Sequence, residues 1–493
     1  YQIFTATKNG DNVAYTLNDA YEGFFQSKIS GASTLTGEAL SEKAYEYVKT
    51  QVGTDGSNGA AFAKDIMGWI LSASGETKTA VESTHSTTTT ADTKTVIENL
   101  AYGYYVVYPL GATDTSTAPG NEAVKSVASL VSVTGDDATV NMKSNYPTVV
   151  KKVNDKNADD VNIGDTVTYT LTSKVPDMTG YTSYVFNFKD TLAKGLTFGS
   201  ITSVTVGSGE NVQNVTEGTG DNTYTLTQDG QNITITMNNF FASNENKAGQ
   251  EINVTYTATL NKDAVTGFDP NTNKATVEYS NKPGTDEKGE SEPSIVDVHT
   301  FNFTIFKYYL KDETKTGLAN AEFELYKANK AGDAADTNAK INIVDEGKGV
   351  YRQATADEAK VTGFTSAKIV SDADGKVLVK GLVAGTYYLR ETKAPEGYNK
   401  LLSDIKVEIK ANYDETTGKL TSYSVDYTYN GTKTPGTAIT SKDNSPEVPV
   451  ENKTGAQLPS TGSKGALMVT LAGIVLFGAL TASKAFGKKK AKN

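Results

Sequence analysis

The sequence predicts a mainly β protein made of tandem immunoglobulin-like β-sandwich domains, preceded by a first domain that mixes helices and strands. Short runs that alternate polar and apolar residues recur throughout 147–455. The 493 residues include 27 Tyr and 44 Gly but only 12 Pro and 1 Trp. Aromatic residues favour strands, and short strands at regular spacing are typical of sandwiches. The length suits about three domains.

The first region, residues 1–146, shows both periodicities. Residues 39–51 and 59–73 have apolar residues at helical spacing, which predicts two amphipathic helices. The apolar run 99–110 predicts a buried strand, and the Thr-rich run 87–90 predicts a loop. We therefore expect an α+β domain here.

The next two regions, 147–297 and 298–455, alternate with a period of two. The runs 165–172, 231–237 and 252–260 are the clearest cases. Such alternation places one face of each strand in a core and the other in solvent. Two β-sandwiches in a row are predicted, which would suit a stalk.

The composition excludes several classes of function. The formal charge is −11, from 47 basic and 58 acidic residues, and nucleic-acid binding needs a basic surface instead. Without Cys there is no disulfide, no Cys-based zinc site and no Cys nucleophile. The only His residues, His85 and His299, lie in a Thr-rich run and at an apparent domain junction, so we expect neither to be catalytic. We expect no cofactor and no metal site, and the acidic run 155–160 is interpreted as a solvated loop.

The C-terminal segment combines three features in a fixed order. Residues 465–482 form an uncharged apolar run that is long enough for a membrane-spanning helix. A Lys-rich tail follows, which the positive-inside rule places in the cytoplasm and which leaves the rest of the chain outside the cell. Directly before the apolar run stands the pentapeptide Leu458, Pro459, Ser460, Thr461 and Gly462.

This arrangement resembles the LPXTG sorting signal of Gram-positive surface proteins. The resemblance implies that a sortase cleaves between Thr461 and Gly462 and passes the Thr461 carboxyl group to an amine of a peptidoglycan precursor or of another subunit. The helix at 465–482 would hold the precursor transiently in the membrane and then be removed. No signal peptide precedes Tyr1, and because sorting requires export, we expect the N-terminus to have been clipped from a longer precursor.

Residues 385–398 (GTYYLRETKAPEGY) resemble the E-box of the CnaB-type domains of Gram-positive pilins and adhesins. The resemblance implies an isopeptide bond between a Lys on the first strand and an Asn on the last strand of the domain. The matching residues are Lys307 and Asn452, with Glu391 as the helper acid. Three ordinary polar residues at strand ends are the alternative.

The chemistry of such a bond sets clear requirements. Burial in an apolar core lowers the pKa of a Lys, so that its amine can act as a neutral nucleophile. A buried carboxylic acid that stays protonated can polarise the carboxamide and move protons as ammonia leaves. By analogy with a disulfide, a bond closing a loop of about 145 residues should stabilise by several kcal/mol.

The second region resembles the D2 domain of fimbrial backbone subunits. In PTVVKKV (147–153), Val149 and Val153 lie on one strand face with Lys151, so Lys151 should point into the core, with Lys152 as its rival. Residues 273–279 resemble the last strand of that family.

The same resemblance supplies the Asn and the acid of the second region. It assigns Asn273, with Asn271 as its rival, and it assigns Asp190 in the stretch 188–198 as the acid. A turn or cap residue is the alternative for Asp190. No isopeptide bond is expected in the first region, which has no E-box acid in the matching place.

The junction 140–147 (VNMKSNYP) carries Lys143. Pilin backbone subunits have a lysine there, often within V-x-Y-P-K, whose amine accepts the next subunit. Asn141 and Met142 replace Tyr-Pro here, so the match is partial. Lys143 is the candidate pilin lysine, and one solvated lysine among many is the alternative.

Together these resemblances imply a non-enzymatic shaft subunit of a covalently polymerised, wall-anchored pilus. Its partners would be a sortase, other copies of itself and the peptidoglycan precursor, with tip and base pilins and host surface ligands as further candidates. A monomeric wall-anchored adhesin on an isopeptide-stapled stalk is the alternative. The implied segments are an N-terminal pilin domain (1–146), a D2-type domain (147–297), a CnaB-type domain (298–455) and a sorting signal (456–493).

A Thr461→Ala change should leave the protein in the membrane fraction, unpolymerised and with its apolar tail, because the acyl donor is lost. Cell fractionation with SDS electrophoresis measures this. Ser460→Ala, at the variable position of the motif, is the control and should sort normally. Normal wall attachment of Thr461→Ala would contradict the sorting interpretation.

Overall fold

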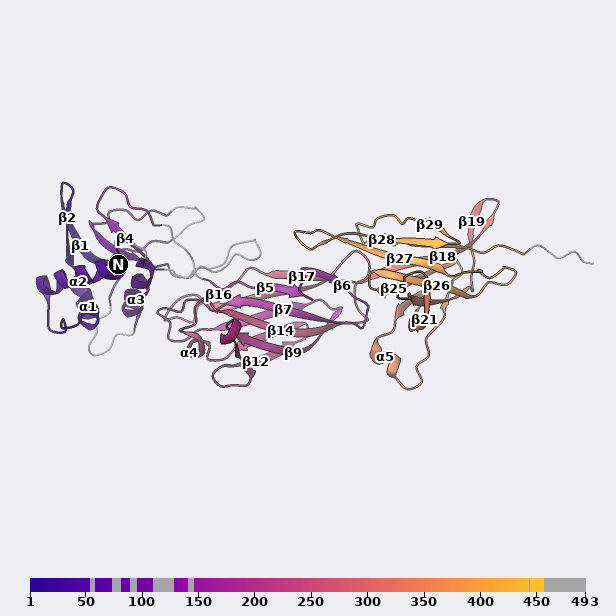
Figure 1. The fold of residues 1–493 in the computed structure, drawn as a ribbon, viewed down its shortest axis with the longest axis horizontal. Coiled ribbons are helices and arrows are strands. Elements are labelled where there is room, and N and C mark those ends of the chain that lie inside the picture. Colours follow the sequence, from indigo (N-terminus) through magenta and orange to yellow (C-terminus); the bar gives the residue numbers. More distant parts are fainter. Residues whose placement is uncertain are drawn as a thin grey trace, which may run out of the picture.

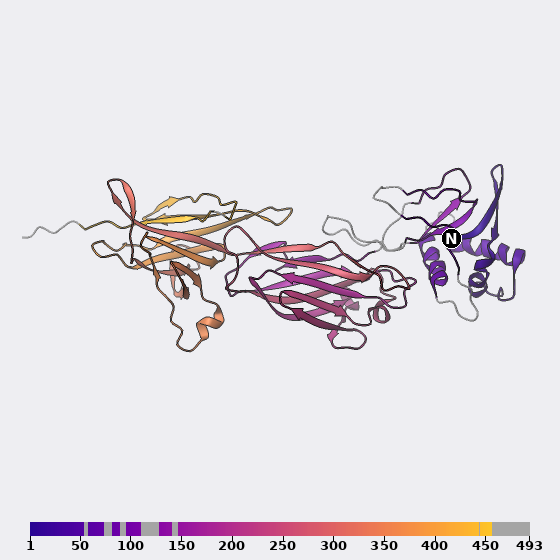
Figure 2. The same ribbon diagram turned by 180° about the vertical axis from the view of Figure 1, so that it is seen from behind.

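The computed structural model describes residues 1–53, 58–72, 81–88, 95–109, 128–140, 146–442 and 444–455. These residues form three separate hydrophobic cores, from Ile3 to Leu130 (the first part), Val149 to Val298 (the second part) and Phe301 to Val450 (the third part). The parts follow one another in an elongated row (Figure 1), which Figure 2 shows from behind. The prediction of a mainly β chain with a mixed first part is confirmed.

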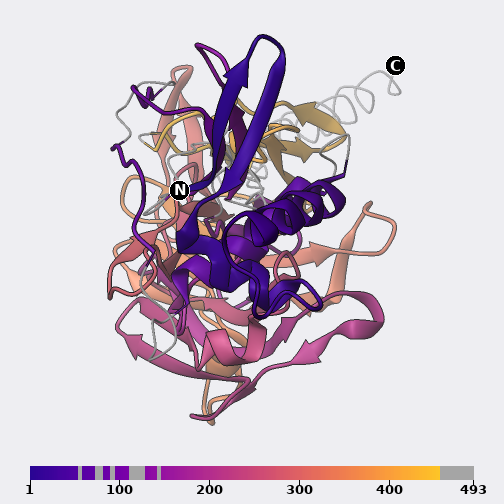
Figure 3. The ribbon, with the colours of Figure 1, turned by 90° about the vertical axis from the view of Figure 1, so that its left-hand side faces the viewer.

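The first part packs helices against a four-stranded antiparallel sheet of order β2-β1-β3-β4. Figure 3 looks along the row from this end and shows α2 beside the β1–β2 hairpin. The predicted helices at 39–51 and 59–73 correspond to α2 and α3. The predicted strand at 99–110 is shorter, because the chain turns at Asn99 with a φ of 61° and pairs only over β3. The elements are β1 (Gln2–Asn9), β2 (Asn12–Leu17), α1 (Glu22–Lys28), α2 (Gly37–Val52), α3 (Gly59–Leu71), β3 (Gly103–Val107) and β4 (Ser129–Val133).

The second part is a sandwich of two sheets. One sheet has the order β10-β9-β14-β7-β5, and the other runs β11-β12-β13-β8-β15-β17-β6 with β16 beside β15. The alternating runs of the sequence are its long strands, whose inward side chains are buried. The main strands are β5 (Val150–Val153), β6 (Ala158–Asp160), β7 (Thr166–Lys174), β8 (Phe186–Leu192), β9 (Leu196–Val206), β12 (Thr223–Asp229), β13 (Asn232–Met237), β14 (Glu251–Leu260), β15 (Asn271–Ser280), β16 (Lys288–Glu290) and β17 (Ser294–His299); β10 (Gln213–Asn214), β11 (Thr216–Glu217) and α4 (Phe240–Asn244) are short.

The third part is a second sandwich. Its sheets have the orders β19-β18-β25-β23-β22, with β30 parallel to β18, and β21-β20-β26-β27-β28-β29, with β24 beside β20. The elements are β18 (Phe301–Lys311), β19 (Thr314–Gly317), β20 (Glu322–Ala328), β21 (Ala335–Lys340), β22 (Ile343–Gly347), β23 (Val350–Gln353), α5 (Ala356–Lys360), β24 (Ile369–Val370), β25 (Lys376–Leu382), β26 (Gly385–Lys393), β27 (Ile405–Tyr413), β28 (Leu420–Tyr429), β29 (Thr432–Thr434) and β30 (Glu447–Glu451).

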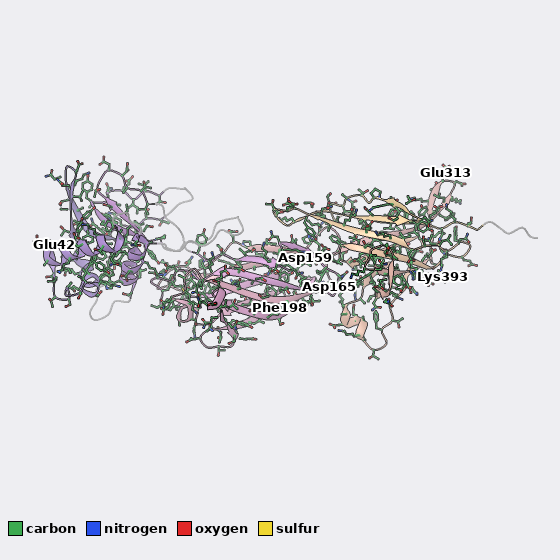
Figure 4. All side chains as sticks on the ribbon, viewed as in Figure 1. Glu42, Asp159, Asp165, Phe198, Glu313 and Lys393 are labelled. Atoms are coloured by element: carbon green, nitrogen blue, oxygen red, sulfur yellow. The ribbon has the colours of Figure 1, made fainter. Side chains whose placement is uncertain are left out.

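A hydrogen-bonded joint connects the second and third parts. Asp160 accepts hydrogen bonds from the Ala384 N–H at 2.7 Å and from the Tyr413 hydroxyl at 2.9 Å. Gly381 has a φ of 83°, and a Cβ there would lie 2.7 Å from the Ile163 Cδ1 atom. The interpretation of 155–160 as a solvated loop is therefore wrong, because β6 pairs with β17 and Asp160 is held in the joint. Figure 4 shows Asp159 and Asp165 at the end of the second part that faces the third.

The two His residues lie in different surroundings, one buried and one exposed. His299 is buried at the joint, where its ring stacks on that of Phe301 and burial lowers its pKa. His85 is exposed.

In the described ranges no helix is long and apolar enough to cross a membrane, and the predicted helix at 465–482 lies outside those ranges.

Candidate functional site

Lys151, Asp190 and Asn273 meet in the core of the second part. Their exposed fractions are 1%, 2% and 0%. Lys151 lies on β5 of one sheet, whereas Asp190 on β8 and Asn273 on β15 belong to the facing sheet. Ala275 pairs opposite Asp190, and because side chains alternate along a strand, Asn273 points to the same face as Ala275. The Lys151 amine forms an ion pair with the Asp190 carboxylate across the sandwich.

The Tyr256 hydroxyl, which sequence reasoning missed, links all three of these residues. It accepts hydrogen bonds from Lys151 Nζ and from Asn273 Nδ2, each at 2.7 Å, and it donates to Asp190 Oδ2 at 2.8 Å. The alternation of 252–260 does place Tyr256 on the buried face of β14. A Tyr in that pattern is normally an apolar core residue, so the pattern carried no signal of a polar role.

The rival residues of the second part have other contacts. Lys152 points away from the core, and its amine donates to Asn157 Oδ1 at 2.6 Å. Asn271 is buried, but its side chain accepts from the Val265 N–H at 2.9 Å and donates to the carbonyl oxygens of Val265 and Val298. The structure therefore brings Lys151 to the Asp190 carboxylate and Asn273 to the Tyr256 hydroxyl that contacts it, and it leaves Lys152 and Asn271 elsewhere. The strand of Asn273 is not the last one of this part, because β17 follows β15.

A second set, Lys307, Glu391 and Asn452, meets in the core of the third part with exposed fractions of 0%, 3% and 1%. The Lys307 amine lies 3.0 Å from Glu391 Oε1. Asn452 Nδ2 donates to Glu391 Oε2 at 3.2 Å. Lys307 is on β18 and Asn452 directly follows β30, the strand beside it, while Glu391 reaches in from β26 of the facing sheet.

Backbone groups hold the second set in place. The Leu401 N–H donates to Glu391 Oε2 at 2.7 Å, and the Asn399 carbonyl accepts from Asn452 Nδ2 at 2.9 Å. The ring of Phe323 lies 5.8 Å from the Lys307 amine. The carboxylate and the carboxamide are therefore held at fixed positions beside an amine in an apolar pocket.

Burial changes the acid–base behaviour of both lysines. It lowers the pKa of Lys151, an effect that the Asp190 charge partly opposes. It lowers the pKa of Lys307 to about 8, again against the charge of the neighbouring carboxylate, here Glu391. Both amines are therefore closer to the neutral, nucleophilic form than a solvated lysine.

Several buried polar atoms of the two sets lack a partner. Asn273 Oδ1 and Asn452 Oδ1 have no hydrogen bond in the described structure, and neither has Asp190 Oδ1. A buried ion pair and an unpaired carboxamide oxygen both oppose folding. The sets are therefore poor stabilisers as they stand, and a reaction that consumes the amine would remove the buried ammonium charge.

The other predicted functional residues lie outside the described ranges. They are Lys143, the pentapeptide Leu458–Gly462 and the apolar run 465–482.

Two family models match the two sandwiches. Residues 163–283 match the model described as Gram-positive pilin backbone subunit 2, Cna-B-like domain. Residues 304–423 match the SpaA model, described as a prealbumin-like fold domain. The "Trypsin-resistant surface T6 protein" of Streptococcus pyogenes serotype M6 is 26% identical over 379 residues, which cover 70% of this chain and 61% of that relative.

Solved structures of pilus proteins resemble the chain more loosely. The T6 backbone pilin of serotype M6 Streptococcus pyogenes has a TM-score of 0.43 and 18% identity, with 92% of this chain and 90% of that one covered. The group B streptococcus pilus 2b backbone protein has a TM-score of 0.43 and 25% identity, with 63% and 99% covered.

If both sets react, the intact mass should lie about 34 Da below the sequence mass, because each bond releases one ammonia. Glu391→Ala and Asp190→Ala should each restore about half of that deficit by removing one acid. Mass spectrometry of the intact protein measures this. Glu396→Ala changes an exposed acid of the same E-box and should keep the full deficit. A folded parent chain of unmodified mass would refute both bonds.

Asn452→Ala should make stability depend on pH, because it leaves Lys307 free in the core. The pKa of Lys307 is about 8 in the folded chain against an ordinary 10.5, so between these values the unfolded state binds more protons. The free energy of unfolding, relative to the parent, should therefore rise with pH in this window by up to about 1.4 kcal/mol per unit. Denaturant titrations from neutral pH upward measure it. If the bond forms, the parent has no Lys307 amine left to titrate, and a difference that stays constant with pH would contradict the prediction.

Proposed function

Because this chain is a relative of the Gram-positive pilin backbone subunits, we propose that it is a structural, non-enzymatic shaft subunit of a covalently polymerised pilus on the cell surface. The observation that carries the proposal is the presence of a buried Lys–acid–Asn set in each of two successive sandwiches. The chain spans about 61% of the length of the T6 relative. Its assembly into a pilus is therefore proposed here together with its role as a subunit.

Each set is proposed to form an intramolecular isopeptide bond. The neutral Lys amine attacks the carboxamide carbon of the Asn, the acid moves protons, and ammonia leaves. The bonds are Lys151–Asn273 with Asp190, and Lys307–Asn452 with Glu391. This self-modification is the only chemistry that the chain itself would perform.

The positions of the two bonds suit a load-bearing stalk. In the third part, β18 begins the sandwich and the parallel β30 ends it, so tension along the row would enter one strand and leave through its neighbour. A bond between Lys307 and Asn452 would carry that tension directly between these strands. In the second part, the bond would connect the first strand of one sheet to the facing sheet.

Polymerisation is proposed to use the sorting signal and the pilin lysine. A sortase would cleave after Thr461 and join its carboxyl group to Lys143 of the next copy. This contact is heterologous and does not close, so it builds a filament. Attachment of the last copy to a peptidoglycan precursor would anchor the filament in the cell wall, after a transient stay of each precursor in the membrane. We further propose 1–146, 147–297, 298–455 and 456–493 as the domain and signal limits.

A monomeric wall-anchored adhesin on the same stapled stalk is the second candidate. The sorting signal and the buried sets would serve it equally well. Electrophoresis of cell-wall extracts separates the two functions, because a shaft subunit gives a ladder of SDS-resistant polymers and the adhesin gives a single band.

Lys143→Ala should abolish the ladder, because the acceptor amine for the Thr461 carboxyl group is lost. The monomer should remain folded, internally cross-linked and wall-anchored, since none of these depends on Lys143. Immunoblots of wall extracts, together with the intact mass, measure the outcome.

Lys152→Ala is the matched control, since Lys152 is a half-exposed lysine close by in the sequence. It should leave the ladder intact. If the ladder persists in Lys143→Ala and peptide mapping finds Thr461 joined to another lysine, the acceptor is misassigned although the filament remains. A single band in the parent chain would favour the adhesin.

A further inference from the structure

We propose that Tyr256 is a catalytic residue of the second part, where its hydroxyl relays the proton that must pass from the Lys151 amine to the departing nitrogen of Asn273. The inference rests on the proposed Lys151–Asn273 bond. It concerns a residue that none of the sequence motifs singles out.

The reaction requires one proton transfer between two nitrogen atoms. A bond forms between Lys151 Nζ and the Asn273 side-chain carbonyl carbon, and the bond from that carbon to Nδ2 breaks. The neutral amine carries two protons and the amide product keeps one, while the NH₂ group needs one more to leave as ammonia. The proton lost by Nζ is therefore the proton gained by Nδ2, and no other reactant is consumed.

The Tyr256 hydroxyl touches both of these nitrogen atoms. It lies 2.7 Å from Lys151 Nζ and 2.7 Å from Asn273 Nδ2. The hydroxyl oxygen accepts from both nitrogen atoms, while its own proton lies toward Asp190 Oδ2. When attack on the carbonyl carbon leaves a lone pair on Nδ2, the hydroxyl can turn this proton to Nδ2 and take one from Nζ, because a neutral hydroxyl is both donor and acceptor. Burial keeps the pKa of Tyr256 well above its usual value, which favours this neutral form.

Asp190 does not make the same double contact. Its Oδ2 atom receives hydrogen bonds from Lys151 and Tyr256, whereas its Oδ1 atom has no partner among the described residues. Within this part of the chain, no hydrogen bond joins Asp190 directly to Asn273. The carboxylate therefore reaches the amide nitrogen through Tyr256.

The third part makes the double contact without a tyrosine. Glu391 Oε1 lies 3.0 Å from Lys307 Nζ, and Glu391 Oε2 accepts from Asn452 Nδ2 at 3.2 Å. The two oxygens of one glutamate thus span both nitrogen atoms. Aspartate is one methylene shorter, so in the second part the carboxylate and Tyr256 together do what Glu391 does alone.

Tyr256→Phe tests the relay, because it removes one oxygen and retains the ring that stacks on Tyr169 with centroids 5.2 Å apart. The freshly folded variant should lie about 17 Da below its sequence mass instead of about 34 Da. Its Lys151–Asn273 bond should form at least about 100-fold more slowly than in the parent. Peptide mapping should find the Lys307–Asn452 cross-link intact, which makes the third part an internal control. A full deficit of about 34 Da at the parent rate would overturn the proposal.

Two further variants separate the relay from simple packing. Tyr169→Phe removes a second buried hydroxyl beside Asn273 that, unlike Tyr256, does not bridge to the Lys151 amine, and it should form both bonds. Asp190→Glu in the Tyr256→Phe background supplies the longer carboxylate found in the third part and should restore bond formation. Loss of the bond in Tyr169→Phe but not in Tyr256→Phe would also overturn the proposal.

Circular dichroism and protease resistance check that Tyr256→Phe is folded. If it is not, 3-fluorotyrosine introduced at position 256 by cell-free synthesis keeps the ring and the hydroxyl but makes the hydroxyl more acidic. A changed rate of cross-linking after synthesis supports the relay, and an unchanged rate overturns it. A parent chain without the Lys151–Asn273 bond would instead refute the proposed bond itself.

Discussion

Two lysine amines buried in the cores of β-sandwiches are the constraint on which the rest of the structure depends. A charged amine in an apolar core is unfavourable unless a carboxylate accompanies it, and the buried pair is still weak support for the fold. Lys151 and Lys307 each have such a partner, from a strand of the facing sheet. The same burial lowers the pKa of both amines, which makes them suitable nucleophiles.

The two sandwiches meet this constraint with different groups. In the third part a glutamate contacts both the amine and the carboxamide, and the backbone N–H of Leu401 helps to fix it. In the second part a shorter aspartate contacts the amine, and the Tyr256 hydroxyl completes the link to the carboxamide. The two proposed bonds also differ in what they connect. The Lys307–Asn452 bond would join neighbouring strands, and the Lys151–Asn273 bond would join facing sheets.

The joint between the sandwiches extends this organisation along the row. Asp160 and Asn162 of the second part accept hydrogen bonds from the backbone N–H groups of Ala384 and Val383, and Gly381 allows the close approach of Ile163. Hydrogen bonds from backbone N–H groups fix the orientation of one sandwich relative to the other better than ion pairs between surface side chains do. With both proposed bonds formed, two sandwiches held in this way would make a continuous segment suited to the proposed shaft.

The sequence by itself determined which residues face inward, because side chains on a strand alternate with a period of two. Lys151 and Lys152 point to opposite faces, so the pattern alone could choose between them, and the E-box motif marked Glu391. Asn271 and Asn273 lie on the same face, so no alternation could separate them. Only the tertiary structure decided, because the loop at Val265 takes up the side chain of Asn271 while Asn273 meets Tyr256 across the sandwich. Alternation tells which side of a strand is buried, but the residues that meet inside depend on how two sheets pack, and that packing is not encoded in any single strand.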